Sequence, residues 1–554
     1  MQKDDQVVYD TIIVGAGVCG LRAGQYLQKG GKSGQQVLLL EARDRVGGRV
    51  YPLDTGRLDN ITPLEEADHT HSLAHSLTPI VIEAGANWIH DLSNKNPICK
   101  LANLLNLETV NMYNEEYEVD PDSVIGDRSY YEKHGVPKVY ERKELLNCEN
   151  IHKSLMLQLA AVNSKLGKCK ASDRHSATLK DALLSAMQRL EAKNPLSDDT
   201  KQLLDFSLEV EATSNAADLD KLGFSAWYNS PDESENGEAL VKGGISQIIP
   251  ALSTGQDVRL KCCVKEIVWG DPSADVSTAF VDPIQLKIIN DTSNHDSENE
   301  GKHDGISIGN EEILSAWNVV VTVPMSCLQQ GTIVFIPPLP QEKVTAMAAI
   351  GVGLLDVVVF RFENSFWPAD KKVFGIPPSE SYSWRGNITN IENDETETMV
   401  FPLDELFYSF LPLSHSRKDD SKLLLAYVHG RRAVQVEQMT NDDIASAACL
   451  SLRMIFGDIV TNPVGCAIHK WGQDRFSMGS YCATCPGTTA EAMKIMASPM
   501  CGITNSLARK LACKARQSCL QFAGEGTDYE CIGLLQGAHN SGTRAAQHIV
   551  KFHM

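Results

Sequence analysis

The 554-residue sequence has no apolar run of the roughly 20 residues that a membrane-crossing helix needs. It also lacks an excess of positive charge, because 51 lysines and arginines face 71 aspartates and glutamates, for a formal net charge of −20. Such a balance does not favour contact with nucleic-acid phosphates. The first residues include Lys3, Asp4 and Asp5 and lead directly into an apolar strand pattern, so no signal peptide is expected. We therefore expect a cytoplasmic protein without a nucleic-acid or membrane partner.

Regularly spaced cysteines are also scarce. The sequence has 15 cysteines, but Cys482 and Cys485 form the only C-x-x-C pattern, and no second pair or suitably spaced histidines accompany it. A structural zinc site needs four such ligands. We therefore expect no metal, and we expect thiols that stay reduced in a cytoplasmic setting.

A glycine-rich loop near the N-terminus is the most informative motif. An apolar run that ends at Val14 predicts a buried parallel strand, and a helical pattern follows the loop directly. Between them stand Gly15, Gly17 and Gly20 in the pattern G-x-G-x-x-G. In dinucleotide-binding folds these glycines allow a tight turn, the close approach of a pyrophosphate and close packing of helix on strand. The helix N-terminus would then face the phosphates.

The next strand supports the same interpretation. Residues 36–40 predict a second strand that ends at Glu41, about twenty residues after the glycines, which is the spacing of a ribose-binding acid. A loop with two glycines and three arginines follows, and arginine suits phosphate oxygens. Its candidate contacts are Arg43, Gly48 and Arg49. The chain therefore begins with a dinucleotide site.

Strand and helix patterns alternate along the rest of the chain, which predicts an α/β fold. Apolar runs predict strands at residues 258–268, 317–324, 354–362, 423–428 and 519–523. Helical periodicity and capping residues predict helices at residues 97–105, 151–166, 179–190, 200–211, 441–456 and 537–550.

Dinucleotide features lie at both ends of the chain and in its middle. We therefore expect a discontinuous Rossmann-type cofactor domain that a mixed α+β substrate domain interrupts twice. The cofactor domain would comprise residues 1–107, 239–328 and 471–554. The substrate domain would comprise residues 108–238 and 329–470. Residues 270–312 are rich in polar side chains and predict a flexible insertion.

Several stretches besides the glycine loop form a specific set of motifs. They are Glu41–Arg49, Gly85–His90, Val320–Pro324, Trp471–Tyr481, Phe522–Thr527 and Gln536–Ala538. Together with the glycine loop they resemble the flavin-containing amine oxidases, most closely the polyamine and spermine oxidases and their histone-demethylase relatives. The resemblance covers nearly the whole chain and implies the amine oxidase fold.

The resemblance implies an FAD molecule that lies extended across the cofactor domain. Glu41 would bind the adenosine ribose, Arg49 the pyrophosphate and the main chain of Val264 the adenine. Glu525 would lie near the ribityl-pyrophosphate region. Ser480 stands where monoamine oxidases attach the flavin through a cysteine, which implies non-covalent FAD. Further contacts are expected from Gly15, Gly17, Gly20, Arg43, Gly48, Gly85, Ala86, Asn87, Trp88, Trp471 and Gly524.

The resemblance also implies a reaction. In that family the flavin takes a hydride from the carbon beside an amine, the imine hydrolyses, and oxygen reoxidises the flavin. The cofactor ring carries out the redox chemistry, and the protein supplies orientation and electrostatics. The implied partners are thus a small-molecule amine, with polyamines among the candidates, and oxygen.

The sequence departs from the family at the reaction centre. Val357 stands where the family has a lysine that holds a water against flavin N5. Ala483, or Thr484 with a shift of one position, and Leu534 stand where the family places side chains of an aromatic cage around the amine. Without that cage the pocket loses a cation–π attraction of about 0.5–2 kcal/mol.

Other candidate residues have two interpretations each. His90 could contact the substrate or be a hydrogen-bonded core histidine. Glu209 and Glu211 could meet a cationic amine, but a solvated helix face is the favoured interpretation. Tyr481 could line the pocket, although a core position is favoured. Trp471 is expected to pack beside the flavin.

Two functional hypotheses follow. The first is an FAD-dependent amine oxidase with an atypical active site. The second is a catalytically impaired FAD-binding protein with a binding or scaffold role. An amino-acid oxidase is a further alternative, but it would need an arginine for the substrate carboxylate, and the sequence does not identify one.

Overall fold

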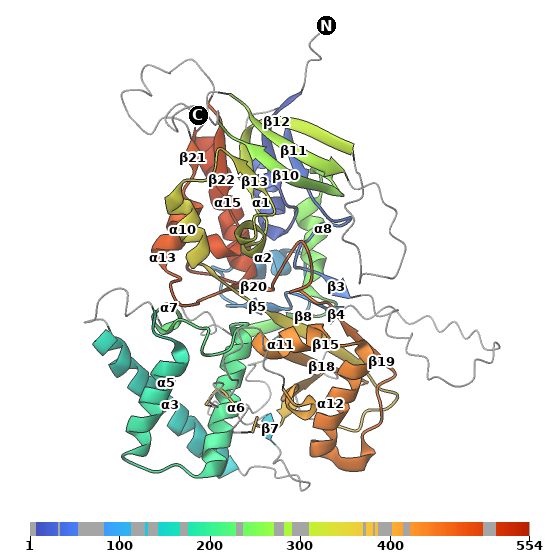
Figure 1. The fold of residues 1–554 in the computed structure, drawn as a ribbon. Coiled ribbons are helices and arrows are strands. Elements are labelled where there is room, and N and C mark those ends of the chain that lie inside the picture. Colours follow the sequence, from blue (N-terminus) through green and yellow to red (C-terminus); the bar gives the residue numbers. More distant parts are fainter. Residues whose placement is uncertain are drawn as a thin grey trace, which may run out of the picture.

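The computed structural model describes residues 7–30, 34–53, 82–111, 128–130, 142–166, 176–228, 237–270, 282–290, 310–368, 373–379, 383–385, 401–413, 422–501 and 517–552. These residues form two lobes, one above the other in Figure 1. The upper lobe contains a large mixed sheet, and the lower lobe contains a smaller sheet beside a group of helices.

Five parallel strands form the centre of the large sheet. Their order is β9 (Asp257–Arg259), β2 (Val37–Leu40), β1 (Val8–Val14), β12 (Asn310–Val321) and β22 (Cys519–Phe522). Ile13 of β1 lies opposite Leu39 and Val320, and all three side chains are fully buried. Uninterrupted apolar strands are what a parallel sheet covered on both faces requires. This order confirms the predicted α/β class and is that of a doubly wound sheet, which binds ligands beyond the carboxyl ends of its strands.

The prediction of a flexible insertion over residues 270–312 is wrong for its middle part, which forms the strand β11 (Ile284–Asn290). β11 is antiparallel both to β10 (Cys262–Val268) and to the first half of β12. Ile284, Leu286 and Ile288 are buried, so the alternation of an ordinary strand was present between two polar flanks. Residues 271–281 and 291–309 lie outside the described part of the chain.

The large sheet also extends past the predicted boundary at residue 328. β13 (Val334–Ile336) pairs in parallel with β10. At another edge, β21 (Met500–Cys501) runs antiparallel to β22. The sheet is therefore parallel at its centre and mixed at its margins.

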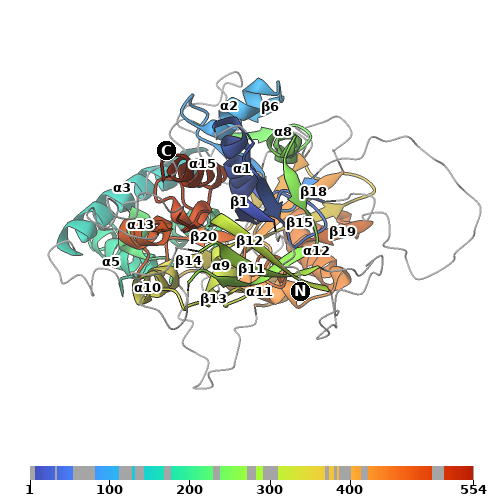
Figure 2. The ribbon, with the colours of Figure 1, turned by 90° about the horizontal axis from the view of Figure 1, so that it is seen from above.

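Helices cover the large sheet. α1 (Val18–Gly30) packs along α15 (Leu535–Phe552), and Figure 2 shows the two side by side. α8 (Ile248–Ser253) and α2 (Pro97–Leu104) complete this layer, and Asn96 caps α2 by accepting a hydrogen bond from the Ile98 N–H. On the other side lie α9 (Met325–Gln329), α10 (Gln341–Ala349) and α13 (Ala490–Ala497).

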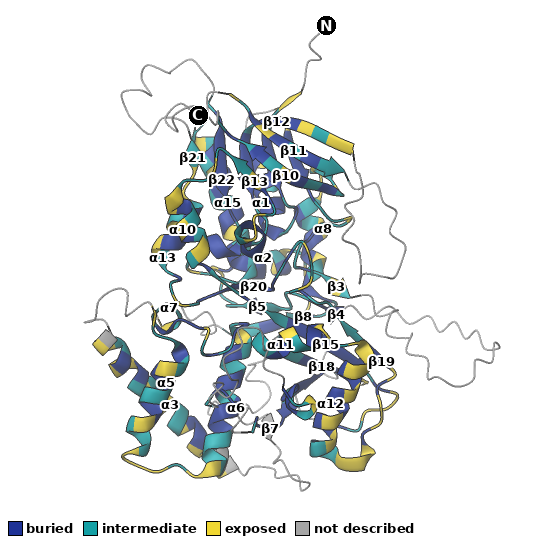
Figure 3. Cartoon of the chain, viewed as in Figure 1, coloured by how far each residue is buried: buried dark blue, intermediate teal, exposed yellow. Residues whose placement is uncertain are grey.

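The lower lobe is built on a mostly antiparallel sheet. Its order is β19 (Gly465–Ile468), β15 (Leu355–Arg361), β18 (Leu423–His429), β17 (Ser409–Pro412), β16 (Val373–Gly375) and β7 (Arg128–Tyr130). α11 (Gly430–Glu437) and α12 (Asn441–Phe456) pack on it around a buried aromatic cluster. The helical part comprises α3 (Arg142–Leu166), α5 (Leu179–Glu191), α6 (Asp198–Ser214) and α7 (Phe224–Tyr228), whose exposed residues face outward in Figure 3.

Short strands lie where the two lobes meet. β5 (Trp88–His90) and β6 (Thr109–Asn111) both pair with β8 (Glu238–Val241). β3 (Pro52–Leu53) pairs with β4 (Ile82–Glu83), and β14 (Gly351–Gly353) pairs with β20 (Tyr481–Ala483). Among the described helices, none is both long and apolar enough to cross a membrane.

Candidate functional site

The glycine loop closes tightly at the carboxyl end of β1. Gly15 has a φ of +103°, and a Cβ there would lie 2.7 Å from Thr322 Oγ1. A Cβ at Gly20 would lie 1.9 Å from the Gly15 carbonyl oxygen. At Gly17 a Cβ would lie 3.8 Å from Gly47 and 3.9 Å from Gly48, which are ordinary contact distances, so this position is less crowded than the other two. The two crowded positions and the less crowded one are those expected of a dinucleotide loop.

Glu41 joins the glycine loop to the arginine-containing loop that follows β2. It is 6% exposed, and its carboxylate accepts hydrogen bonds from the N–H groups of Ala16 at 2.8 Å and Arg43 at 2.9 Å. The Gly47 N–H in turn donates to the Ala16 carbonyl at 2.9 Å. The carboxyl ends of β1 and β2 are thus held as one unit.

Arg43 makes a bidentate ion pair with Asp474, at 2.8 and 2.9 Å, and also donates to Ser477 Oγ. Although burial alone would raise the pKa of Asp474, hydrogen bonds from His469 and Arg43 hold it below its ordinary value. The carboxylate is therefore ionised, and the pair fastens the loop after β2 to the segment that begins at Trp471.

Arg49 and Glu525 form a second ion pair between distant segments. Arg49 Nη1 donates to Glu525 Oε1 at 2.8 Å and to the Ser480 carbonyl at 2.9 Å. The other carboxylate oxygen of Glu525 accepts from the N–H groups of Cys482 and Gly533. Next to this pair a Cβ at Gly524 would meet no atom within 4 Å, so the main chain borders open space.

The Gly85–Trp88 stretch passes against Trp471. A Cβ at Gly85 would lie 2.0 Å from the Arg49 carbonyl oxygen and 3.0 Å from the Trp471 ring. The indole N–H of Trp471 donates to the Ala84 carbonyl at 3.0 Å, and the Ala86 N–H donates to the Arg49 carbonyl at 3.2 Å. Asn87 and Trp88 follow directly. Only glycine fits at residue 85, because the two chain segments touch there.

Val264 lies at an irregularity of β10. Its side chain is 5% exposed in the core, and the pairing of β10 with β11 shifts between Val264 and Glu266. Such a bulge leaves main-chain groups outside the regular ladder. The backbone, rather than the side chain, is thus the part of Val264 able to contact a ligand.

Val357 lies in an aliphatic wall on β15. It is 2% exposed and belongs to a cluster with Ile82 and Leu425. Its partner across the strand pair is Tyr427 of β18, which the sequence analysis did not identify. Burial raises the pKa of Tyr427, while hydrogen bonds with Trp88 and Asn87 lower it, so this phenol lies against the Gly85–Trp88 stretch. The next lysines along the chain, Lys371 and Lys372, come after the end of β15 and lie outside the described residues.

A pair of buried carboxyl groups lies on the opposite face of β15. Asp356 is fully buried and accepts from the Trp471 N–H at 3.2 Å, while Glu437 accepts from the Gly472 N–H at 2.6 Å. Burial raises the pKa of Asp356, and the Glu437 carboxylate raises it further. Burial likewise raises the pKa of Glu437. The sequence signal for this pair was one acid inside the apolar run of residues 354–360.

The positions predicted to stand in place of the aromatic cage are Ala483 or Thr484 and Leu534. Ala483 is 3% exposed in β20 opposite Gly351, within an apolar cluster, and Thr484 is 4% exposed. Leu534 is half-buried immediately before α15. Tyr481 is half-buried, and its hydroxyl donates to the Ser214 carbonyl at 2.9 Å at the end of α6.

His90 pairs with Glu238 across β5 and β8, with 2.5 Å between Nδ1 and Oε1. The imidazole thus has a fixed carboxylate partner. The main-chain carbonyl of His90 accepts a hydrogen bond from the Gln536 side chain of α15.

The expectation that Glu209 lies on a solvated helix face is wrong. Glu209 is 4% exposed and lies 3.3 Å from Arg432, with His429 at 3.7 Å. Burial raises the pKa of Glu209 to about 7. Glu211 is half-buried and accepts from the Trp227 indole at 2.7 Å. The helical part of the lower lobe therefore contains buried charge, which helical periodicity alone did not indicate.

Comparison with known proteins identifies the family. Residues 18–550 match the family described as flavin containing amine oxidoreductase. Lysine-specific histone demethylase 1 homolog 3 of Arabidopsis thaliana is 26% identical over 566 residues, which cover 97% of this chain and 30% of that protein. Polyamine oxidase 4 of Oryza sativa subsp. japonica is 25% identical over 541 residues, which cover 97% of this chain and 87% of that protein. A lysine-specific histone demethylase 1B homolog of Caenorhabditis elegans is 26% identical over 560 residues, with 97% and 56% covered.

The chain belongs to the flavin-containing amine oxidoreductase family. It spans about a third and about half of the length of the two demethylase relatives, and most of the polyamine oxidase. Membership implies FAD. The geometry fits that cofactor, because uncrowded main chain at Gly17 and open space at Gly524 lie beside fixed charges at Glu41, Arg49 and Glu525.

Proposed function

We propose that the protein is an FAD-dependent oxidoreductase that oxidises the C–N bond of an amine of the polyamine type and passes electrons to oxygen. The observation that carries the proposal is the closed glycine loop joined through Glu41 and beside the Arg49–Glu525 pair. Family membership supports the amine as substrate class. FAD held without a covalent bond fits Ser480, whose hydroxyl donates to the Leu355 carbonyl at 2.7 Å.

Each part of the site has a role in this proposal. The loop from Gly15 to Gly20 and the start of α1 would hold the diphosphate, because free N–H groups gather there. Glu41 would accept from the ribose, and Arg49 would neutralise phosphate charge. The main chain of Val264 would meet the adenine, while Gly85–Trp88, Trp471 and Glu525 would border the flavin.

When bound, FAD supplies the hydride acceptor. The chain's own residues would orient the amine and keep water away from it. Val357, Ala483 and Leu534 offer apolar contacts, whereas Tyr427 beside Asn87 offers a polar one. A secondary amine with an aliphatic substituent suits such a pocket better than a compact primary amine does.

The proposal is tested by mixing FAD-loaded protein anaerobically with a panel of amines and recording the visible absorbance of the flavin. Bleaching by a secondary amine or polyamine, followed by peroxide release in air, is expected. Bleaching by amino acids alone would replace the proposal with an amino-acid oxidase. No bleaching by any compound would refute an oxidase.

The variant Val357→Lys distinguishes an oxidase that turns over slowly for lack of this lysine from a protein that has lost catalysis altogether. Val357→Lys is expected to accelerate turnover by about tenfold or more, because a group that positions water or moves protons contributes at least that much. The matched control is Val359→Lys, on the same face and in the same cluster. Turnover is compared in FAD-loaded protein. Equal turnover in both variants would favour the alternative below.

The alternative is an FAD-binding protein without oxidase activity, acting through binding. It is favoured by one observation, the apolar side chains at all three positions that depart from the family. A protein that binds FAD yet shows no flavin reduction, even as the Val357→Lys variant, would support it.

A further inference from the structure

Two cysteines and a histidine meet at the edge of the large sheet. Cys501 belongs to β21, Cys519 begins β22, and His548 lies in the last turns of α15. Their ligating atoms all lie within 4.8 Å of one another. Gly524 follows the other end of β22, so this cluster is separate from the cofactor site.

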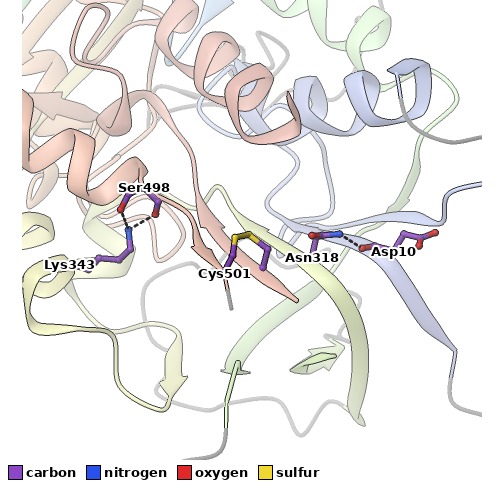
Figure 4. The surroundings of a disulfide bond; sticks show 6 residues. Asp10, Asn318, Lys343, Ser498 and Cys501 are labelled. Atoms are coloured by element: carbon purple, nitrogen blue, oxygen red, sulfur yellow. Dashed lines mark hydrogen bonds between the residues drawn. A yellow bond between two sulfur atoms is a disulfide. The ribbon is translucent and has the colours of Figure 1, made fainter. Parts of the chain in front are cut away.

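The cysteines directly face each other across the β21–β22 pair and form a disulfide in the structure. Their Cα atoms are 4.4 Å apart, the spacing of a non-hydrogen-bonded pair of antiparallel strands. Figure 4 shows this disulfide, with Asn318 of β12 on one side of it and Ser498 on the other. The Lys343 ammonium donates a hydrogen bond to the Ser498 carbonyl at 2.7 Å. The sheet therefore holds both sulfurs at one place whether or not they are bonded. This pairing differs from the expectation that all thiols stay reduced.

The same three groups have the chemistry of a zinc site. Thiolates and imidazole are the preferred zinc ligands, with bond lengths of about 2.3 Å to sulfur and about 2.0–2.1 Å to nitrogen. Tetrahedral coordination at those lengths separates ligand atoms by about 3.5–3.8 Å. Because the atoms already lie within 4.8 Å of one another, rotation of the two cysteine side chains reaches that arrangement once the sulfurs part. Cys501 and His548 are half-buried, which leaves an approach for the ion.

We propose that Cys501, Cys519 and His548 bind Zn²⁺ when the disulfide is reduced, with water as the fourth ligand. A dithiol reductant supplies two electrons and two protons, becomes a disulfide itself, and leaves two thiols. Zn²⁺ then displaces both thiol protons and accepts the lone pair of the neutral imidazole. The disulfide and the zinc ion are thus alternative cross-links at one place.

The zinc form would connect an additional element. The disulfide ties β21 to β22 alone, whereas zinc would also attach α15. The other end of that helix contacts β5, where the Gln536 side chain donates to the His90 carbonyl. The ring of His548 packs parallel to Phe552, with centroids 6.0 Å apart, so the imidazole has limited freedom to turn.

The test measures zinc bound per chain after anaerobic reduction and removal of the dithiol. Reduced protein is expected to bind one Zn²⁺ that the oxidised protein does not bind. Cys501→Ser, Cys519→Ser and His548→Gln should each lose it. Cys263→Ser and His539→Gln, which alter a cysteine of β10 and a histidine of α15 outside the cluster, should retain it.

Alkylation of the unaltered chain tests the proposal even if the variants do not fold. Zinc should slow alkylation of Cys501 and Cys519 by at least about tenfold in reduced protein, as read by mass spectrometry of the peptides, and leave Cys263 unchanged. Co²⁺ in place of zinc should give the absorption of a tetrahedral thiolate site. Equal alkylation with and without zinc, or zinc retained by all three ligand variants, would overturn the proposal and leave a structural disulfide.

Discussion

Two buried acids near the junction of the lobes have opposite kinds of partner. Glu525 faces the guanidinium of Arg49, whereas Asp356 faces a second carboxyl group, that of Glu437. The first arrangement is an ion pair, whereas the second favours protonation of Asp356, because two carboxylate charges in contact repel each other. Each therefore predicts a different response to mutation.

Arg49→Met should weaken both FAD binding and folding. The variant leaves the Glu525 carboxylate, 7% exposed, with only N–H partners, which costs about 1.5–3 kcal/mol. The FAD dissociation constant should rise, and the melting temperature should fall. Arg453→Met on α12, whose guanidinium donates to Asn462 at 3.2 Å on the exposed surface, is the control. Unchanged FAD affinity in Arg49→Met would contradict the proposed phosphate role.

Glu437→Gln should change how stability depends on pH. Burial raises the pKa values of Asp356 and Glu437, so the folded chain keeps protons that the unfolded chain loses above about pH 4. Folding stability contributed by this pair is therefore present at low pH and is lost as pH rises. Glu437→Gln removes one charge and should flatten that decline.

The measurement is urea unfolding between about pH 5 and pH 8. Buried Asp205 and Glu209 also have raised pKa values, about 6 and about 7, and contribute a decline of the same sign in both proteins. The difference between wild type and variant isolates the pair. Glu491→Gln on the exposed face of α13 should not alter the slope. Identical slopes in Glu437→Gln and wild type would show that the pair does not share a proton.

Among the elements, α1 and α15 control the position of the glycine loop. The loop runs directly into α1, and α15 approaches that helix at Gly542, where a Cβ would lie 2.2 Å from the Cys19 carbonyl oxygen. Cys19 belongs to the first turn of α1. A change in helix spacing there would move the N–H groups proposed to bind the diphosphate.

Gly542→Ala should therefore reduce both stability and FAD affinity. Overpacking against backbone costs about 1–3 kcal/mol. Gly30→Ala, at the far end of α1 with its nearest atom 3.5 Å from a Cβ, should be tolerated. Calorimetric melting and FAD titration of both variants provide the comparison. Normal FAD affinity in Gly542→Ala would show that the spacing of α1 and α15 does not control the position of the glycine loop.

Elements with local signals were predictable from the sequence. Thr440 and Asn441 were alternative caps for α12 from the sequence, and Thr440 is the cap, accepting from the Asp443 N–H. Gly457 ends that helix with a φ of +65°, as the sequence indicated. β11 was missed because its short alternation lies between polar stretches. Its stability depends on pairing with β10 and β12, which are distant in sequence and invisible to a local window.

At the scale of the whole molecule, the cofactor side of the site was more predictable than the substrate side. Gly15, Glu41 and Arg49 lie in contiguous motifs, and their contacts follow from strand order. Tyr427 and Glu437 come from β18 and α11, and only the packing of the lower sheet brings them to Val357 and Asp356. Pairing between distant strands has no signature in a single sequence.

The visible absorbance of the protein after loading with FAD and gel filtration tests the central claim most directly. The two loops at the carboxyl ends of β1 and β2, joined by Glu41, should retain one flavin per chain and release it on denaturation. The predicted result is a yellow protein whose flavin separates from the polypeptide in denaturant. Protein that stays colourless after loading would contradict the account.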